Sequence, residues 1–213
     1  MNRTIILLTA WLMTWPLGSG ILQAQNKMPT DPVMASKWLA DRGEAVAKKE
    51  GSVRVVSLTL GNVKLSELAI FPKLQMLRLG WLGRQEPGYF ESLSKFKNLE
   101  DFEIRMGRLS EEDLQSIAKA PKLKSLTIFN SIEFETLAPL ANSSTLEKLE
   151  LTYCYGLNLD TLEALTKCQS LRELKIKDIS ESHGEPKIGW LSDKHLELIS
   201  QIPSLQRLSL IHI

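Results

Sequence analysis

Histidine and cysteine are scarce in this chain, which has three histidines and two cysteines among 213 residues. The sequence contains no C-x-x-C or H-x-x-x-H spacing of the kind that holds zinc. It also lacks G-x-S-x-G, a phosphate loop and H-E-x-x-H, and the three histidines (His183, His195 and His212) stand in no recognisable motif. We therefore expect no metal, no cofactor and no enzymatic activity.

A surplus of charge is also missing. The chain has 26 basic and 25 acidic residues, and a chain beginning at Gln25 would lose only Arg3, leaving a net charge of zero. Proteins that bind nucleic acid or anionic membranes in general carry a basic surplus. The balance argues against both partners.

Charge is absent from residues 4–24. The order "MNR", "TIILLTAWLMTW", "PLGSG" and "ILQAQ" is typical of a signal peptide, with Ala24 at the cleavage site. We predict that residues 1–24 are removed and that the protein is exported to the periplasm or the medium. The alternative is that the uncharged segment stays uncleaved as a membrane anchor. No second such run follows, so we expect no membrane span after signal cleavage.

A helix is predicted in residues 25–52, from "TDPVMASKWLADRGEAVAKKEG". Asp31 or Thr30 can cap it, Pro32 suits the first turn, and Gly51 ends it. We interpret this segment as an N-terminal capping helix.

A hydrophobic motif, close to L-x-x-L-x-L, recurs seven times in the rest of the chain. It begins at Val55, Leu74, Leu99, Leu123, Leu146, Leu171 and Leu205. The intervals are 19, 25, 24, 23, 25 and 34 residues. Self-similarity at such a period is the signature of a repeat architecture.

Each motif predicts a short strand whose leucines point inward, because side chains alternate between the two faces of a strand. Helical patterns follow, with capping pairs at Ser110 and Asp113, at Asp160 and Glu163, and with a start at Ser192. One unit cannot bury its own leucines, and stacked units make a continuous core. We predict an α/β fold in which residues 53–213 form about seven repeats, with a parallel sheet and helices outside it.

This pattern resembles the leucine-rich-repeat family, and in particular its cysteine-containing subtype. Cys154 and Cys168 occupy the two cysteine positions of that subtype, in one unit only. The helix pattern L-S-x-x-x-L-x-x-I is similar to that of short exported bacterial repeat proteins. The resemblance implies a right-handed horseshoe solenoid, with the parallel sheet on the concave face and short helices on the convex face. It also implies a non-catalytic module that binds a protein or a cell-envelope ligand. The alternative is an enzyme or carbohydrate-processing protein on a repeat scaffold.

The two cysteines are expected to be buried and unpaired. They lie at opposite ends of the strand layer, which is roughly 16 Å deep for a five-residue strand, whereas a disulfide needs α-carbons within about 7 Å. A disulfide in an exported chain is the alternative.

Charged residues occupy the exposed positions of the predicted strands. Parallel stacking would align Lys148, Glu173 and Arg207, and would set Glu150 beside Lys175 and Arg78 beside Glu103. One interpretation is a polar ladder that satisfies itself. The other is a binding patch, because aromatic residues and arginine are enriched in protein interfaces. The candidate partner-binding residues are Arg78, Trp81, Glu103, Arg105, Phe129, Tyr153, Lys175 and Trp190.

The final unit is longer than the others and ends in an apolar strand. Its extra residues lie in 178–191, where Trp190 either packs or contacts a partner. Leu208, Leu210, Ile211 and Ile213 make the last strand hydrophobic. We expect the 178–191 loop, a second copy pairing through residues 205–213, or the partner to cover this edge.

Overall fold

The computed structural model describes most of the chain from Lys27 onward. The described residues are 27–42, 44–49, 52–60, 63–81, 88–105, 108–130, 136–154, 157–177 and 192–211. Residues 1–24 and Trp190, which figure in the sequence predictions, lie outside these ranges.

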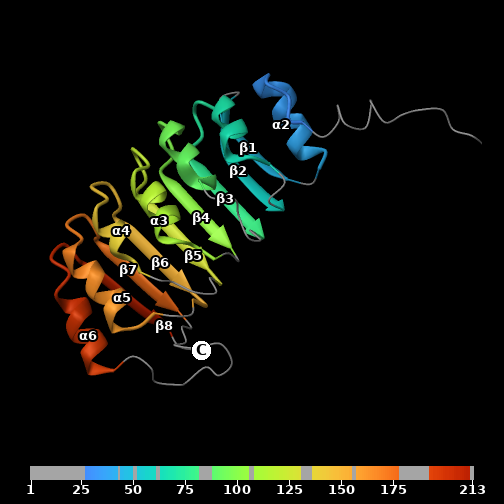
Figure 1. Cartoon of the computed structure of the whole chain (residues 1–213). Helices are drawn as coiled ribbons and strands as arrows, with labels where there is room; N and C mark the ends of the chain where they lie inside the picture. The colour runs from blue at the N-terminus through green and yellow to red at the C-terminus, as the bar shows by residue number, and fades with distance from the viewer. Residues whose placement is uncertain are drawn as a thin grey trace, which may run out of the picture.

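The fold is α/β, and an eight-stranded sheet runs through it in sequence order (Figure 1). The strands are β1 (Ala45–Lys49), β2 (Ser52–Leu60), β3 (Met76–Trp81), β4 (Asp101–Arg105), β5 (Ser125–Phe129), β6 (Lys148–Thr152), β7 (Glu173–Lys177) and β8 (Arg207–Ile211). All neighbours from β2 to β8 are parallel, and only β1 and β2 are antiparallel. The parallel strands and their order agree with the predicted α/β fold.

Short helices connect the parallel strands and lie along one side of the sheet, with α2 at the end of the sheet that carries β1 (Figure 1). The α-helices are α2 (Pro32–Ala40), α3 (Glu111–Ala118), α4 (Ala138–Ala141), α5 (Leu159–Glu163) and α6 (Asp193–Ser200). The 3-10 helices are η1 (Leu65–Ile70), η2 (Tyr89–Lys95) and η3 (Ala164–Lys167). The other face of the sheet carries the polar side chains of the strands, and we call it the open face.

The core lies between the sheet and the helices. Register pairing aligns Leu77, Phe102, Leu126, Leu149, Leu174 and Leu208 in one row of the sheet. All of these except Leu208 are almost fully buried. The inward direction of the motif leucines is therefore confirmed from β3 to β7. The buried set runs from Met28 to Ile202 as one cluster.

The N-terminal segment differs from the prediction of one helix over residues 25–52. The carboxylate of Asp31 accepts hydrogen bonds from the backbone N–H groups of Val33 and Met34, so the predicted cap is confirmed. However, α2 ends at Ala40, and residues 45–49 form β1 instead. The reason is tertiary: β1 pairs with the free edge of β2, which would otherwise leave its backbone groups unpaired.

Helix starts agree with the sequence at two sites and differ at one. Ser110 and Asp113 form a reciprocal capping box, as predicted. Ser192 caps α6 through the same arrangement with His195. The predicted pair of Asp160 and Glu163 is wrong, because Asn158 caps α5 through the N–H of Thr161. In addition, η1 and η2 are 3-10 helices, since their units are too tightly wound to complete α-helical turns.

Within the described part of the chain, no helix has both the length and the hydropathy needed to cross a membrane.

Candidate functional site

The open face is built from three rows of side chains, because alternate residues of every strand point away from the core. The first row contains Asp101, Ser125, Lys148, Glu173 and Arg207. The second contains Arg78, Glu103, Thr127, Glu150, Lys175 and Ser209. The third contains Arg105, Phe129, Thr152, Lys177 and Ile211. The rows predicted from the motif spacing are confirmed by this register.

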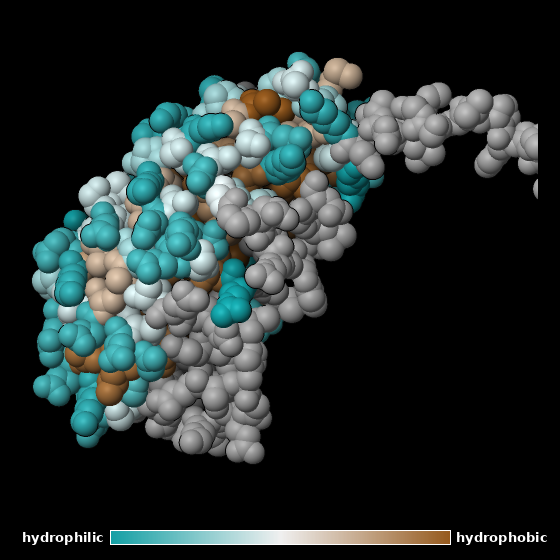
Figure 2. All heavy atoms as spheres, viewed as in Figure 1, coloured by the Kyte–Doolittle hydropathy of each residue, from teal (hydrophilic) through white to brown (hydrophobic). Residues whose placement is uncertain are grey.

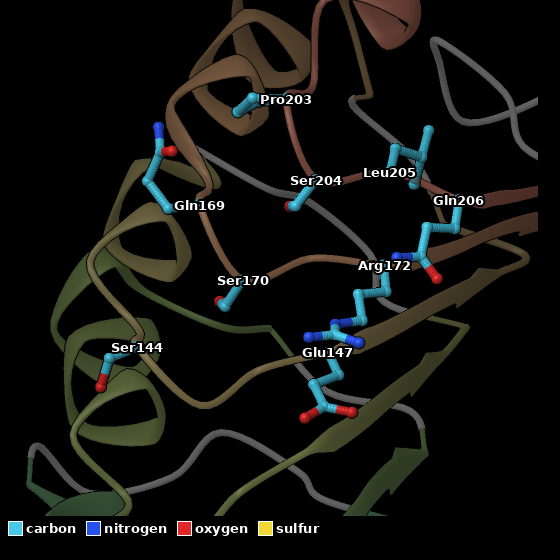
Figure 3. A pocket seen from close by; sticks show the side chains of 9 residues that line it. All are labelled: Ser144, Glu147, Gln169, Ser170, Arg172, Pro203, Ser204, Leu205 and Gln206. Carbon is cyan, nitrogen blue, oxygen red and sulfur yellow. The ribbon is translucent and has the colours of Figure 1, made fainter.

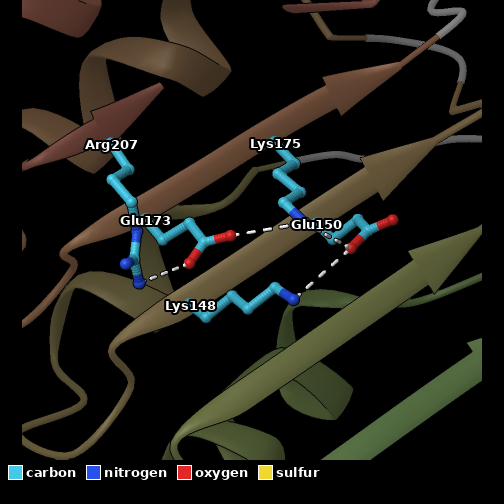
Figure 4. Close-up of polar contacts among 5 residues, drawn as sticks. All are labelled: Lys148, Glu150, Glu173, Lys175 and Arg207. Carbon is cyan, nitrogen blue, oxygen red and sulfur yellow. Dashed lines mark hydrogen bonds and ion pairs between the residues drawn. The ribbon is translucent and has the colours of Figure 1, made fainter. Parts of the chain in front are cut away.

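A ladder of ion pairs joins β6, β7 and β8 (Figure 4). Glu150 Oε2 lies 3.7 Å from Lys148 Nζ and 4.0 Å from Lys175 Nζ. Lys175 Nζ also lies 3.3 Å from Glu173 Oε1. The other oxygen of Glu173 accepts a hydrogen bond of 2.7 Å from Arg207 Nη2. Each carboxylate in this ladder therefore contacts two cations.

The ladder changes the acidity of Glu173. Partial burial pushes the pKa of this carboxyl group upward, but the hydrogen bond from Lys175 and the positive charges of Arg207, Lys148 and Lys175 outweigh it. The pKa of Glu173 consequently lies below its ordinary value. The ladder is polar and partly exposed, and each of its charged groups has an ion-pair partner, as in the self-satisfied polar ladder that the sequence offered as one interpretation.

A second charged cluster lies on β3 and β4. Glu103 Oε2 is 2.9 Å from Arg78 Nε, and its other oxygen accepts a hydrogen bond from Arg105 Nε. Ser125 and Thr127 of β5 separate this cluster from the ladder. Arg105 has a second neighbour, because its guanidinium lies 5.8 Å from the ring centre of Phe129.

Phe129 in turn packs against Tyr153. Their ring centres are 5.3 Å apart and the planes are inclined by 77°, an edge-to-face contact. Tyr153 remains 39% exposed. The contact is made after the strands end, where Asn130 and Tyr153 both adopt positive φ angles of 55° and 51°.

The left-handed conformation of Tyr153 is unusual for a bulky residue and costs roughly 1–2 kcal/mol. Two backbone hydrogen bonds hold this turn in place. The N–H of Asn130 donates to the carbonyl of Thr152 at 2.8 Å, and the N–H of Tyr153 donates to the carbonyl of Lys177 at 3.0 Å. The strained turn therefore places an aromatic ring in solvent beside Phe129 at the sheet rim.

We define the rim patch as Arg105, Phe129, Tyr153 and Lys177. Three of these residues, Arg105, Phe129 and Lys177, belong to the third row, in which Thr152 lies between Phe129 and Lys177. This row contains two cations and no carboxylate. This composition differs from the first and second rows, where acids and bases alternate.

The predicted site residues fall into three groups. Arg78, Glu103, Arg105, Phe129 and Tyr153 form one continuous series of contacts. Lys175 belongs to the separate ladder and is not part of this series. The backbone of Trp81 pairs with that of Arg105, and only its backbone is described, whereas Trp190 lies outside the described residues. Lys177 was missed, although its spacing after Lys175 would have placed it in the third row.

Both cysteines are buried thiols, as predicted. The Sγ of Cys154 lies 3.4 Å from the carbonyl oxygen of Ile128. Burial raises the pKa of Cys168 to about 11. In the ranges that the structure covers, no three His, Cys, Asp or Glu side chains cluster closely enough to hold a metal ion.

A polar hollow of about 430 Å³ lies among the turns that lead into β6, β7 and β8 (Figure 3). It is lined by Ser144, Glu147, Gln169, Ser170, Arg172, Pro203, Ser204, Leu205 and Gln206. Ser170 Oγ donates to the carbonyl of Ser143 at 2.8 Å, and Ser204 Oγ donates to that of Leu171 at 2.7 Å. These hydroxyls stabilise the turns, and we assign the hollow no ligand.

The chain matches no protein-family model, and a search of curated proteins gives no match. We therefore infer its function from the surface residues themselves.

Proposed function

We propose that this chain is an exported leucine-rich-repeat protein, a horseshoe solenoid that binds a protein partner on its open, concave face and catalyses no reaction. The seven recurrences of the hydrophobic motif support the family. The sequential parallel sheet, with its rows of buried leucines, supports a solenoid. Export is supported by the apolar, uncharged residues 4–24.

The exposed Tyr153 carries the proposal. A bulky residue in the left-handed region costs free energy, and such strain is concentrated at functional sites. Here the strain holds a tyrosine ring 39% exposed against Phe129, with Arg105 beside that ring. Tyrosine and arginine are two of the three residue types that dominate binding energy in protein interfaces.

The charges around the patch indicate how a partner is selected. Glu103 is already paired with two arginines, and every charged group of the ladder on β6 to β8 has an ion-pair partner. Exposed ion pairs of this kind contribute little free energy and mainly oppose wrong partners. Arg105 and Lys177 bring two cations to the rim, where the nearest carboxylate is Glu103, which Arg78 shares, so an acidic segment with an apolar side chain complements the rim best.

Site-specific photocrosslinking tests this function. A photoreactive phenylalanine analogue at Tyr153 keeps an aromatic ring on the rim, and the same analogue at Lys119 on the helix side is the matched control. The chain would be expressed with its N-terminal segment and irradiated in cell-envelope and culture-fluid fractions. We expect one discrete crosslinked protein from position 153 and none from position 119.

Loss of that crosslink in Arg105→Glu, with unchanged thermal stability, would confirm that the patch is the contact. Identical crosslinking from both positions, or from neither, would contradict a binding site on this rim.

A further inference from the structure

The charge of the chain is divided unevenly between its two ends. Residues 27–81 contain nine basic and five acidic residues, a surplus of four positive charges. Residues 82–213 contain 16 basic and 20 acidic residues, a surplus of four negative charges. The net charge of the whole chain is near zero, which argued against an anionic membrane partner, but the part of the chain from residue 27 to 81 is basic. Such asymmetry is a signature of binding to an anionic surface.

At this basic end, the first turn of α2 exposes apolar side chains. Val33 is 70% exposed and Met34 is 63% exposed, the largest values among the exposed large hydrophobic residues of the described chain. Figure 2 shows hydrophobic surface among hydrophilic residues at this end of the molecule. The turn is held rigidly, because the Asp31 carboxylate accepts hydrogen bonds from both backbone N–H groups. The apolar pair is therefore presented to solvent by a fixed backbone.

Cations and an aromatic residue continue the same face of α2. Lys37 lies four residues after Val33, and Trp38 four after Met34, so both stand one helical turn further along. The guanidinium of Arg42 stacks on the Trp38 ring at 3.7 Å from its centre. The Trp38 ring also packs against the core, so it fixes Arg42 beside the exposed turn of α2.

A shallow apolar hollow adjoins Val33. It has a volume of about 190 Å³ and is lined by Pro32, Val33, Lys48, Ser52, Val53, Phe71, Pro72 and Lys73. Two lysines from different strands and turns thus stand beside apolar surface next to the exposed turn of α2. We define the cap surface as Val33, Met34, Lys37, Lys48 and Lys73.

Acidic groups occur on the same elements. Asp31 is occupied by the α2 cap, and Asp41 and Glu44 follow α2, with Glu67 on η1. None of these four lines the hollow. The cap surface thus carries three lysines against one adjacent carboxylate, that of Asp31, which accepts hydrogen bonds from the backbone N–H groups of Val33 and Met34.

We infer that the cap surface docks on the surface of an anionic phospholipid bilayer, with Val33 and Met34 entering the interface and the lysines contacting phosphate groups. Charge complementarity favours this occupant over a protein, and so does the alternative in which residues 4–24 stay uncleaved as a membrane anchor. The uncharged residues 4–24 are joined to α2 by residues 25–31, which span at most about 25 Å when extended. Any membrane association of that segment brings the cap surface within reach of the lipid.

This inference does not depend on the proposed partner, because the cap surface lies on α2, β1 and the turn before β3, whereas the rim patch lies on β4 to β7. Lysine footprinting of the full chain tests it. The chain is reconstituted in vesicles of phosphatidylcholine alone, or with about one third phosphatidylglycerol, and treated with a membrane-impermeant acylating reagent. Mass spectrometry then gives the labelling of each lysine. Both vesicles retain the N-terminal segment, so their difference reports the cap surface.

We expect the acylation of Lys37, Lys48 and Lys73 to fall about fivefold in the anionic vesicles, which corresponds to about 1 kcal/mol of attraction for each lysine at the surface. High salt screens this attraction, so the labelling should recover there. Lys119, Lys167 and Lys194, which lie on other elements, should label equally in both vesicles.

The variant with Lys37, Lys48 and Lys73 changed to Glu should lose protection at Lys27 and Lys49. The variant with Lys119, Lys167 and Lys194 changed to Glu is the charge-matched control and should keep it.

Equal labelling of the wild-type chain in both vesicles would overturn the inference, whatever the variants do. Equal protection of Lys119 and Lys167 would also overturn it, because the contact would then be non-specific. Protection by soluble glycerol phosphate without vesicles would show binding of free phosphate rather than of a lipid surface, and would overturn the choice of occupant.

Discussion

Arg207 Nη2 lies 2.7 Å from Oε2 of Glu173, although the two residues are 34 positions apart in the sequence. The unit between them is the longest of the seven. The register of β7 and β8 is nevertheless the same as that of the shorter units, with Glu173 beside Arg207 and Leu174 beside Leu208. Additional residues in a connection thus leave the strand layer unchanged, because hydrogen bonding and leucine packing set the register.

Replacing Glu173 with Gln should lower the free energy of unfolding at neutral pH by less than about 1 kcal/mol, since the ion pairs are partly exposed. The pKa of Glu173 is lowered in the folded state, so its contribution is complete above the ordinary value of 4.5 and is lost as pH falls through the folded pKa. Urea unfolding of both proteins at about pH 7 and at about pH 2 to 3 measures the free energy of unfolding in each case. The difference between the proteins should disappear in acid, and a difference that grows there would contradict the assigned direction.

Replacing Tyr153 with Gly should give a protein that is more stable than Tyr153→Ala by about 1 kcal/mol, because glycine adopts the left-handed conformation without strain. Both variants remove the ring, so any loss of partner binding should be equal in the two. Denaturant unfolding measures the stability difference. Equal stability of the glycine and alanine variants would mean that the turn at position 153 is not strained.

The two cysteine thiols should resist alkylation in the folded protein and react fully in denaturant. Both are buried, and burial raises the pKa of Cys168 to about 11, so almost no reactive thiolate exists near neutral pH. Intact-mass measurement after alkylation without reductant checks this. Two added groups in denaturant are expected, whereas a mass that shows neither cysteine modified would indicate a disulfide.

The strand β8 leads to a prediction about the edge of the sheet. Leu208 is 43% exposed and Ile211 is 47% exposed, and β7 is the only strand paired with β8 among the described residues. If residues 205–213 pair with a second copy, Ile211→Lys should convert a dimer into a monomer in sedimentation analysis. If residues 178–191 cover the edge, the monomer should instead lose about 1–3 kcal/mol of stability.

Ser209→Lys is the matched control for the edge, because it adds the same charge on the same face of β8 as Ile211 but replaces a polar side chain instead of an exposed apolar one. Unchanged mass and unchanged stability in Ile211→Lys would show that the edge has neither role.

Much of the open face could be predicted from the sequence. The pairs Arg78 with Glu103, Glu150 with Lys175, and Glu173 with Arg207 were placed side by side from the motif spacing alone, and the register confirms them. This succeeded because parallel strands of equal motif position stack at a constant separation. Lys177 was not among the candidate binding residues, although the same spacing places it at an exposed position of its strand.

The failures arose where contacts between distant residues override local pattern. Residues 45–49 carry alanine and lysine, which favour helix, yet they pair with β2 because that edge has no other partner. The sequence predicted Asp160 as the cap of α5, but the structure has Asn158 there, since the start of a helix depends on where the preceding turn ends. The exposure of Val33 and Met34 was also not visible in the sequence, because a residue pattern does not show whether another element covers a helix face.

The sequence by itself determined the strand positions, the inward leucines, the buried thiols and the order of charges on the open face. All of these follow from a short periodic motif, because periodicity converts position in the chain directly into position in the sheet. Only the tertiary structure decided that β1 closes one edge, that Tyr153 turns its ring outward beside Phe129, and that Val33 meets Lys48 and Lys73 at one surface. These features depend on backbone torsions and on contacts between different units, and a motif that describes one unit does not contain them.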